Sequence, residues 1–460
     1  MKFTKKIIIT LFVMFSIIMS SSTLVRADEV KAIDTGMKQD VYAVGQYSNW
    51  DGVPTVSQFI GADGQFCFAF KKDSKIIVVK TKGGKVEEKL KLKMKGTLFG
   101  AVTCDSDGYY YVVTGKPNSG QDTSEKTIFI TKYDASGKLV KSVGDNGRTS
   151  LASYYDNSFN TKIPFDGGTC DVAINGEYIA VNYGREMYSG HQSNSVWLLN
   201  KNTMKTVTPS TDSYYGYLNY QSHSFAQRAI PYADGFAFMS EGDCYDRAFT
   251  FSTADLVNNT SVETPIFDFW VPKGTLDDYN MYVLNNNFAH MGDLCALNNG
   301  TVSFVASSVK ALSNTALKQR EQLFIQIFNP MEDLTKKSAY ITTGKRSGIA
   351  GKNGDEKKTN YGVKWLTSYK TGRISNPQAV TDGKGNTIIL FERQNKSGKY
   401  LGVYCIVVDV KGNVVKEAFR ISKTAYLNSC ETPVYTKGSV YWCGNTTESN
   451  KLFVYKFKVS

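Results

Sequence analysis

The stretch AVTCDSDGYYYVVTG (residues 101–115), continued by TIFITKYDASGKLVKSVG (residues 127–144), decides the fold. In its first half, the apolar runs 102–105 and 109–114 flank the turn Ser106-Asp107-Gly108. In its second half, the runs 127–133 and 138–143 flank residues 134–137, which end in Gly137. Tight turns with Asp and Gly between alternating apolar runs indicate β-hairpins. The stretch therefore predicts four antiparallel strands with a polar loop in the middle.

The same unit recurs along the chain, and its first turn marks each copy. A four-stranded sheet cannot bury both faces alone, so seven such units must stack around a common axis. The sequence therefore predicts an all-β fold, a β-propeller of seven four-stranded blades. Counts of six or eight blades remain open, because the fifth copy is diffuse. The seven first turns are Asp63-Gly64, Asp107-Gly108, Asn175-Gly176, Asp234-Gly235, Asn299-Gly300, Asp382-Gly383 and Lys437-Gly438.

The two ends of the chain suggest how the ring closes. The seventh copy supplies strands near 432–436, 440–443 and 452–459, and no fourth strand follows them. Residues 40–47 read as an unclaimed strand, which we expect to complete the last blade and remove an exposed sheet edge. This assigns residues 28–39 to a lead-in and residues 40–460 to one propeller domain. The repeat and its turns resemble those of secreted bacterial β-propeller proteins. That resemblance implies the architecture but no activity, because propellers host enzymes and binding platforms alike.

Residues 1–27 have the pattern of a secretory signal peptide. Three lysines within residues 2–6 precede an apolar run over 7–19, and Val25-Arg26-Ala27 predicts cleavage after Ala27. No later apolar run is long enough to span a bilayer. We therefore expect a secreted or cell-surface-associated protein with no membrane span after cleavage. The alternative is an uncleaved anchor.

Cleavage would leave 50 basic against 42 acidic residues, a net charge of +8. Such a charge favours anionic surroundings, such as cell-wall polymers or acidic polysaccharides, although it also serves solubility alone. No basic helix or nucleic-acid motif is present, so we expect no nucleic-acid partner. Eight cysteines lie after residue 27 without any CxxC spacing, mostly in strand-like runs. They are expected to be mostly free, buried thiols.

Loop lengths predict which face is functional. If the strands of a blade are named a to d, the a–b and c–d turns lie on one face and are short. The b–c loops and d–a connections lie on the other, which we call the long-loop face, and long structured loops on a rigid scaffold usually carry function. We assign the stretch 343–375 to a d–a connection, which we expect to make this face positive. Its basic residues are Lys345, Arg346, Lys352, Lys357 and Lys358.

All three histidines fall on the predicted long-loop face. His191 lies in a b–c loop, whereas His223 and His290 lie in d–a connections of the next two units. A histidine or tyrosine can move a proton while an arginine holds a carboxylate. The candidate catalytic residues are His191, His223, His290, Arg185, Arg228, Arg247 and Tyr188. The candidate binding residues are Gln192, Gln227, Asp243, Asp246, Asp293, Tyr214, Tyr215, Tyr217, Tyr220 and Trp270, where the aromatic rings suit stacking on sugars.

Three functions fit these residues. The preferred hypothesis is an exported propeller that binds an extracellular glycan or cell-envelope polymer through the long-loop face. The second is a polysaccharide lyase or glycoside hydrolase, with a His/Arg/Tyr site on that face. The third is a platform for a protein partner. A structural alternative is that the charged groups of these loops only pair with one another. No organic cofactor is expected. A divalent metal at the histidines is a further possibility, although no HxH or HExxH spacing supports it.

Overall fold

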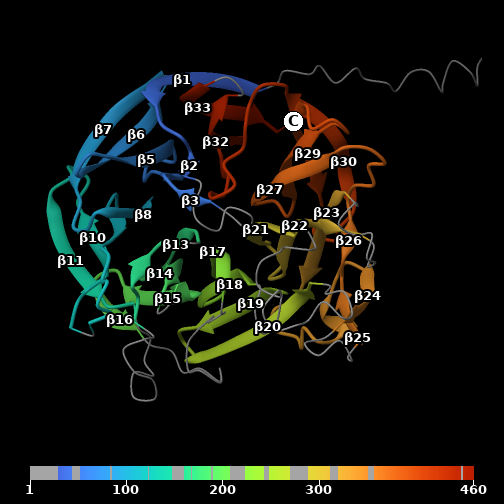
Figure 1. Cartoon of the computed structure of the whole chain (residues 1–460), viewed down its shortest axis with the longest axis horizontal. Coiled ribbons are helices and arrows are strands. Elements are labelled where there is room, and N and C mark those ends of the chain that lie inside the picture. Colours follow the sequence, from blue (N-terminus) through green and yellow to red (C-terminus); the bar gives the residue numbers. More distant parts are fainter. Residues whose placement is uncertain are drawn as a thin grey trace, which may run out of the picture.

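The computed structural model describes residues 30–43, 52–82, 85–122, 124–147, 160–166, 168–187, 190–207, 223–242, 248–269, 289–310, 320–350, 357–446 and 449–459. Within them, seven antiparallel sheets stand around a central axis, and the chain passes from one to the next in order (Figure 1). Helix in this part of the chain is limited to the short 3-10 turn η4 (Lys337–Ala339) and to Gly190. The predicted seven-bladed β-propeller is therefore confirmed.

The blades are numbered along the chain. Blade 1 contains β4 (Val56–Ile60), β5 (Phe66–Lys72), β6 (Lys75–Lys82) and β7 (Lys85–Lys93). Blade 2 contains β8 (Leu98–Cys104), β9 (Tyr110–Gly115), β10 (Ile128–Tyr133) and β11 (Leu139–Asp145). Blade 3 contains β13 (Cys170–Asn175), β14 (Tyr178–Glu186), β15 (Gln192–Asn200) and β16 (Lys205–Val207), with β12 (Ile163–Pro164) also paired to β14. Blade 4 contains β17 (Ser224–Tyr232), β18 (Gly235–Gly242), β19 (Ala248–Asp255) and β20 (Thr260–Asp268).

The remaining three blades include blade 5, whose fourth strand is very short, and blade 7, whose fourth strand comes from the N-terminal part of the chain. Blade 5 contains β21 (His290–Ala296), β22 (Val302–Val309), β23 (Glu321–Phe328) and β26 (Lys364–Trp365). Blade 6 contains β27 (Arg373–Thr381), β28 (Thr387–Gln394), β29 (Tyr400–Val408) and β30 (Val414–Ser422). Blade 7 contains β31 (Val434–Thr436), β32 (Ser439–Thr446), β33 (Ser449–Lys458) and, from the other end of the chain, β1 (Val30–Lys38). All seven predicted first turns lie between the first and second strands of a blade.

An N-terminal strand closes the ring, as predicted, but it lies earlier in the chain than expected. β1 pairs antiparallel with β33, with Ile33 opposite Val454 and Lys38 opposite Lys451. The closing strand therefore falls within 28–39, the predicted lead-in, and not at 40–47. Of the latter stretch, Tyr42–Ala43 form the two-residue strand β2, which pairs with β3 (Val53–Pro54). β1 is an outer strand that exposes half of its residues, so its sequence lacks a continuous apolar run.

The stretch 343–375 also differs from the prediction of a simple d–a connection. It contains the hairpin of β24 (Lys345–Ala350) and β25 (Lys357–Tyr361), and then the fourth strand of blade 5, β26. Arg346 of this hairpin is buried, and it donates to the carbonyl oxygens of Asp268 (2.7 Å) and Val309 (3.2 Å). Arg346 therefore adds no charge to the surface. Lys352 lies outside the described residues.

The hydrophobic core is divided among the gaps between blades. Each cluster of buried apolar side chains joins two neighbouring blades, and the described residues contain such a cluster at each of the seven junctions. Blades 7 and 1, for example, share Ile33, Val454, Phe68 and Ile77. The seven described cysteines form no disulfide bond with one another, and all except the half-buried Cys104 are buried, as expected for small apolar side chains.

Polar side chains also tie each blade to the next near the long-loop face. In six junctions, a side-chain oxygen of one blade accepts the backbone N–H of a residue in, or leading into, the first strand of the following blade. Blades 2 and 3 instead share the ion pair of Asp105 and Lys201, at 3.3 Å, which lies in the short turns of the opposite face. The six hydrogen bonds fix the relative position of the loops on the long-loop face. The acceptor and donor residues are Ser57 and Val102, Asp171 and Ala229, Glu241 and Met291, Asp293 and Ala379, Glu392 and Leu427, and Glu431 and Gln58.

Candidate functional site

Two of the three histidines meet on the long-loop face between blades 3 and 4. His223 Nε2 lies 3.2 Å from His191 Nδ1, and the ring centroids are 4.5 Å apart. The backbone fixes this pair, because His223 N–H donates to the Gln192 carbonyl at 2.7 Å and Met187 N–H donates to the His191 carbonyl at 2.6 Å. His223 itself has a left-handed backbone (φ 50°), which turns the chain sharply into β17.

The electrostatic surroundings keep His191 neutral. Burial, and to a smaller extent the neighbouring His223 and Arg185, lower its pKa to about 4. At neutral pH this imidazole therefore has one nitrogen with a lone pair and one N–H. Such a ring can accept a proton or ligate a metal. The described residues contain no group of three His, Cys, Asp or Glu side chains that could hold a metal ion, so the pair alone offers two ligands.

Arg185 and Arg228, predicted to hold a substrate carboxylate, are both buried and engaged within the protein. Arg185 donates to Ser193 Oγ (3.0 Å), to Thr161 Oγ1 (3.3 Å) and to the Gly147 carbonyl oxygen. Its relative exposure is 1%. It therefore supports the b–c loop of blade 3 from beneath.

Arg228 crosses the central channel instead. Its Nε donates to Asp293 Oδ1 at 2.7 Å, and its Nη2 donates to the Ser429 carbonyl oxygen at 3.0 Å. Asp293 Oδ1 also accepts from Thr432 Oγ1 at 2.6 Å, while its Oδ2 accepts the Ala379 N–H. One carboxylate thus joins blades 4, 5 and 6 to the segment that leads into blade 7. This geometry is that of a structural tie.

The other predicted residues are placed as follows. Gln227 is fully buried beside blade 3, where its Oε1 accepts from Thr169 Oγ1 at 3.0 Å. Gln192 is buried at the start of β15, and His290 is half-buried at the start of β21. The structure thus brings His191 and His223 together and pairs Arg228 with Asp293. The remaining predicted residues lie outside the described residues: Tyr188, Tyr214, Tyr215, Tyr217, Tyr220, Asp243, Asp246, Arg247 and Trp270.

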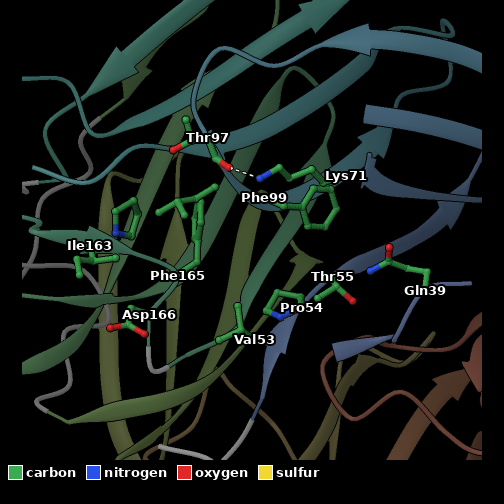
Figure 2. Close-up of a pocket in the computed structure, with 12 residues that line it drawn as sticks. Gln39, Val53, Pro54, Thr55, Lys71, Thr97, Phe99, Ile163, Phe165 and Asp166 are labelled. Atoms are coloured by element: carbon green, nitrogen blue, oxygen red, sulfur yellow. Dashed lines mark hydrogen bonds between the residues drawn. The ribbon is translucent and has the colours of Figure 1, made fainter. Parts of the chain in front are cut away.

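The structure also shows a pocket that the sequence did not predict. It has a volume of about 340 Å³ and lies on the long-loop face, where blades 1, 2 and 3 meet (Figure 2). Its apolar side is formed by Phe99, Phe165 and flanking aliphatic residues, and Lys71 stands at its edge, with Nζ donating to the Thr97 carbonyl at 2.7 Å. Its lining residues are Gln39, Val53, Pro54, Thr55, Lys71, Thr97, Leu98, Phe99, Ile163, Pro164, Phe165 and Asp166.

Two glycines of blade 2 allow the pocket to form. A Cβ at Gly100 would lie 2.7 Å from Phe165 Cζ, and a Cβ at Gly115 would lie 2.5 Å from Pro164 Cγ. Both distances are too short for any side chain other than hydrogen. Phe165 has φ 63° and packs edge-on against Tyr183, with the ring centroids 6.1 Å apart. The aromatic side of the pocket is therefore rigid before any ligand arrives.

Sequence reasoning missed this pocket because its residues carry little titratable chemistry. They come from the short connections that lead into β4 and β8, together with β12 and the turn that follows it. The signal that was available is topological, because every d–a connection reaches the same face as the b–c loops. Searching those connections for prolines and aromatic residues would have found Pro54, Phe99 and Pro164-Phe165.

No family model matches the chain, and no curated protein is similar to it at a significant level. Solved structures with a similar fold include three of low identity. A sialidase from Trypanosoma rangeli is 10% identical with a TM-score of 0.43, over 94% of this chain and 60% of the sialidase. An α-L-arabinanase from Cellvibrio cellulosa is 11% identical with a TM-score of 0.31, over 70% of this chain and 96% of the arabinanase.

The third is the extracellular domain of a putative hybrid two-component system from B. thetaiotaomicron. It is 10% identical with a TM-score of 0.43, over 94% of this chain and 43% of that chain. The chain thus spans well under two thirds of this protein and of the sialidase. At these identities and scores the comparisons carry no functional argument. The class of this protein is that of the β-propellers. In the part of the chain that the structure describes, no helix is both long and apolar enough to cross a membrane.

Proposed function

We propose that this protein is exported and that its long-loop face binds an extracellular glycan or cell-envelope polymer, with one unit of the polymer in the pocket between blades 1, 2 and 3. The observation that carries the proposal is the composition of the pocket. Phe99, Phe165 and two prolines provide an apolar side, whereas Lys71, Thr55 and Asp166 provide polar groups at its edge. Pyranose rings have the matching character, because their C–H faces pack on aromatic rings while their hydroxyls bind polar groups.

The size and rigidity of the pocket support this proposal. A volume of about 340 Å³ is at the small end of the range of ligand sites, about 300–1,000 Å³. The pocket is open on a face that the ring holds rigid through the inter-blade bonds. A preformed site loses less conformational entropy on binding than a site that must order itself. These properties favour a single repeating unit of a larger, extended ligand.

The test is a binding screen of residues 28–460 against neutral and acidic polysaccharides, by affinity electrophoresis and calorimetry. Thr97→Trp places a bulky side chain at the edge of the pocket, and Thr203→Trp places the same side chain at an exposed turn on the opposite face. We expect Thr97→Trp to weaken binding at least tenfold and Thr203→Trp to leave it unchanged. The proposal would be contradicted if binding survives Thr97→Trp, or if none of the polysaccharides binds.

A second candidate function rests on the histidine pair. The 3.2 Å contact and the neutral state of His191 are suited to proton transfer, as a polysaccharide lyase or hydrolase would require. Arg185 and Arg228 already form hydrogen bonds within the protein, so a substrate carboxylate would need another partner. An assay for unsaturated products or new reducing ends, with and without chelator, separates the two functions. Products that disappear in a His191→Ala/His223→Ala variant would establish the enzyme, and chelator sensitivity would add a metal.

A further inference from the structure

Exposed lysines gather on the long-loop side of blades 7 and 1, beside the pocket. We call this group the lysine edge. Each member lies at the end of a strand, or in a connection, that reaches the long-loop face. The lysine edge consists of Lys38, Lys71, Lys72, Lys75, Lys93, Lys95 and Lys451. The strands β1 and β7, which carry Lys38 and Lys93, are in contact and follow one another along the rim (Figure 1).

The register of the sheets places these lysines directly opposite one another. Lys72 of β5 pairs with Lys75 of β6, which pairs with Lys93 of β7, so that three lysines form a row across blade 1. Neighbouring strands are about 4.8 Å apart, so the row spans about 10 Å. In blade 7, Lys38 of β1 faces Lys451 of β33 in the same way. Like charges in directly opposite positions destabilise a sheet.

Little in the protein neutralises this repulsion. Among the described residues, no ion pair involves any of the seven lysines. Within three residues of these lysines the sequence has three carboxylates, Asp40, Asp73 and Glu448, against seven cations. An anion that bridges the lysines of a row would relieve the repulsion. We infer that the lysine edge is the binding surface for a linear acidic polymer, whose sugar or polyol units carry a carboxylate or phosphate at regular intervals.

The inference rests on the proposed function and names the class of its ligand. The lysine edge reaches the pocket at Lys71, which lines the pocket, and Lys38 precedes another lining residue, Gln39. Lys72, Lys75 and Lys93 lie on the other face of the blade 1 sheet from Lys71, because side chains alternate along a strand. A polymer with one unit in the pocket would therefore cross the rim of blade 1 to place further anionic groups over this row. A single small anion would not use a row of this length. All seven cations are lysines, which act as point charges and do not impose the bidentate geometry of arginine.

The surroundings favour a polymer over a membrane. Peripheral membrane surfaces combine lysines with exposed aromatic or aliphatic side chains. The large apolar side chains that the described residues expose lie elsewhere, for example Leu139 and Val140 in blade 2 and Val257 and Val262 in blade 4. The lysine edge has no such neighbour among them, and its apolar partner is the concave pocket.

The test compares polygalacturonate, a poly(glycerol phosphate) and neutral dextran as ligands of residues 28–460. The edge variant is Lys72→Gln/Lys75→Gln/Lys93→Gln, and the matched control is Lys384→Gln/Lys396→Gln/Lys411→Gln, three exposed lysines in the turns of blade 6. We expect the edge variant to bind the acidic polymers about tenfold or more weakly at low salt, and raising NaCl to weaken wild-type binding steeply. The control variant should match the wild type.

The outcomes separate the inference from the proposed function. Equal binding of dextran and the acidic polymers, with no effect of the edge variant, would refute the acidic ligand and leave the pocket proposal standing. No binding to any polymer would refute both. Vesicles of anionic lipid that bind more tightly than the polymers, and lose binding in the edge variant, would assign the surface to a membrane and overturn the inference. The inference is supported if the edge variant loses binding to the acidic polymers and the control variant does not.

Discussion

Replacing Asp293 by Asn tests whether the channel tie holds the ring together. Asp293 is fully buried and accepts hydrogen bonds from Arg228, Thr432 and the Ala379 N–H. Asn keeps the shape but removes the charge and one acceptor oxygen, so the buried guanidinium loses its ion-pair partner. Breaking one member of a buried pair costs about 3–5 kcal/mol. That is a large part of the about 5–15 kcal/mol that stabilises a typical domain.

Neighbouring carboxylates do not replace Asp293 as the partner of Arg228. Burial raises the pKa of Asp171 and raises that of Glu431 well above its usual range, so both resist ionisation. The expected loss for Asp293→Asn is therefore about 3–5 kcal/mol in the free energy of unfolding at pH 7, measured by urea titration.

A double-mutant cycle separates the ion pair from other effects of the substitution. The variants are Asp293→Asn, Arg228→Met and the two combined. Removing both charges leaves no unpaired ion, so the combined variant should lose clearly less than the sum of the single losses. A loss below about 1 kcal/mol for Asp293→Asn, or additive single effects, would refute the tie as the source of stability.

Three further predictions follow from buried groups and close contacts. Burial raises the pKa of Glu392 to about 7, so between pH 4.5 and 7 the folded protein holds a proton that the unfolded chain has lost. Stability should fall as pH rises through this window, by about 3 kcal/mol in all, and Glu392→Gln should abolish that dependence in urea titrations at several pH values. For His191, NMR titration should give a midpoint near pH 4, and stability should fall as pH decreases from 6.5 towards 4, because the unfolded chain binds the proton first. A midpoint near 6.5 would show that the ring is open to solvent. Finally, Gly115→Ala should lower the free energy of unfolding by about 1–3 kcal/mol through the clash with Pro164, whereas Gly120→Ala, which meets nothing within 4 Å, should be neutral in thermal denaturation.

The sequence predicted those parts of the fold that depend on local turns. Six of the seven first turns place Gly in a left-handed backbone (φ between 54° and 86°), and that requirement is visible in one chain without further information. In the turn of blade 4, Ala233 takes this conformation (φ 45°) and Gly235 begins β18. The closing strand was misplaced because β1 lies at the rim, where Lys31, Asp34 and Lys38 are exposed and interrupt the apolar pattern. Ile33 is the one buried residue of this strand, so its hydrophobicity is a weak signal.

Prediction of the site depended on distances that the sequence does not contain. Residue type and topology predicted that the three histidines lie in one sector of the long-loop face, and in the structure His191 and His223 are in contact. They did not show that Arg228 and Asp293, also predicted as site residues, form a buried ion pair with each other. Arg346 was predicted at the surface and is buried against Phe267, with its guanidinium 4.0 Å from the ring centroid. Packing between blades decides whether a charged side chain pairs with a buried group or is exposed to a ligand. The periodicity of the sequence does not show this packing.

The pairing of β1 with β33 also delays the closure of the ring during synthesis. Thr35 and the Leu452 carbonyl, which form a hydrogen bond in the last blade, are 417 residues apart. At a synthesis rate of about 5–20 residues per second, β1 waits on the order of 20 to 80 seconds for its partner. During that interval blades 1 to 6 can form while their two ends remain open. The ring therefore closes only after β33 has been synthesised, and until then β1 is an unpaired strand that is exposed to other chains.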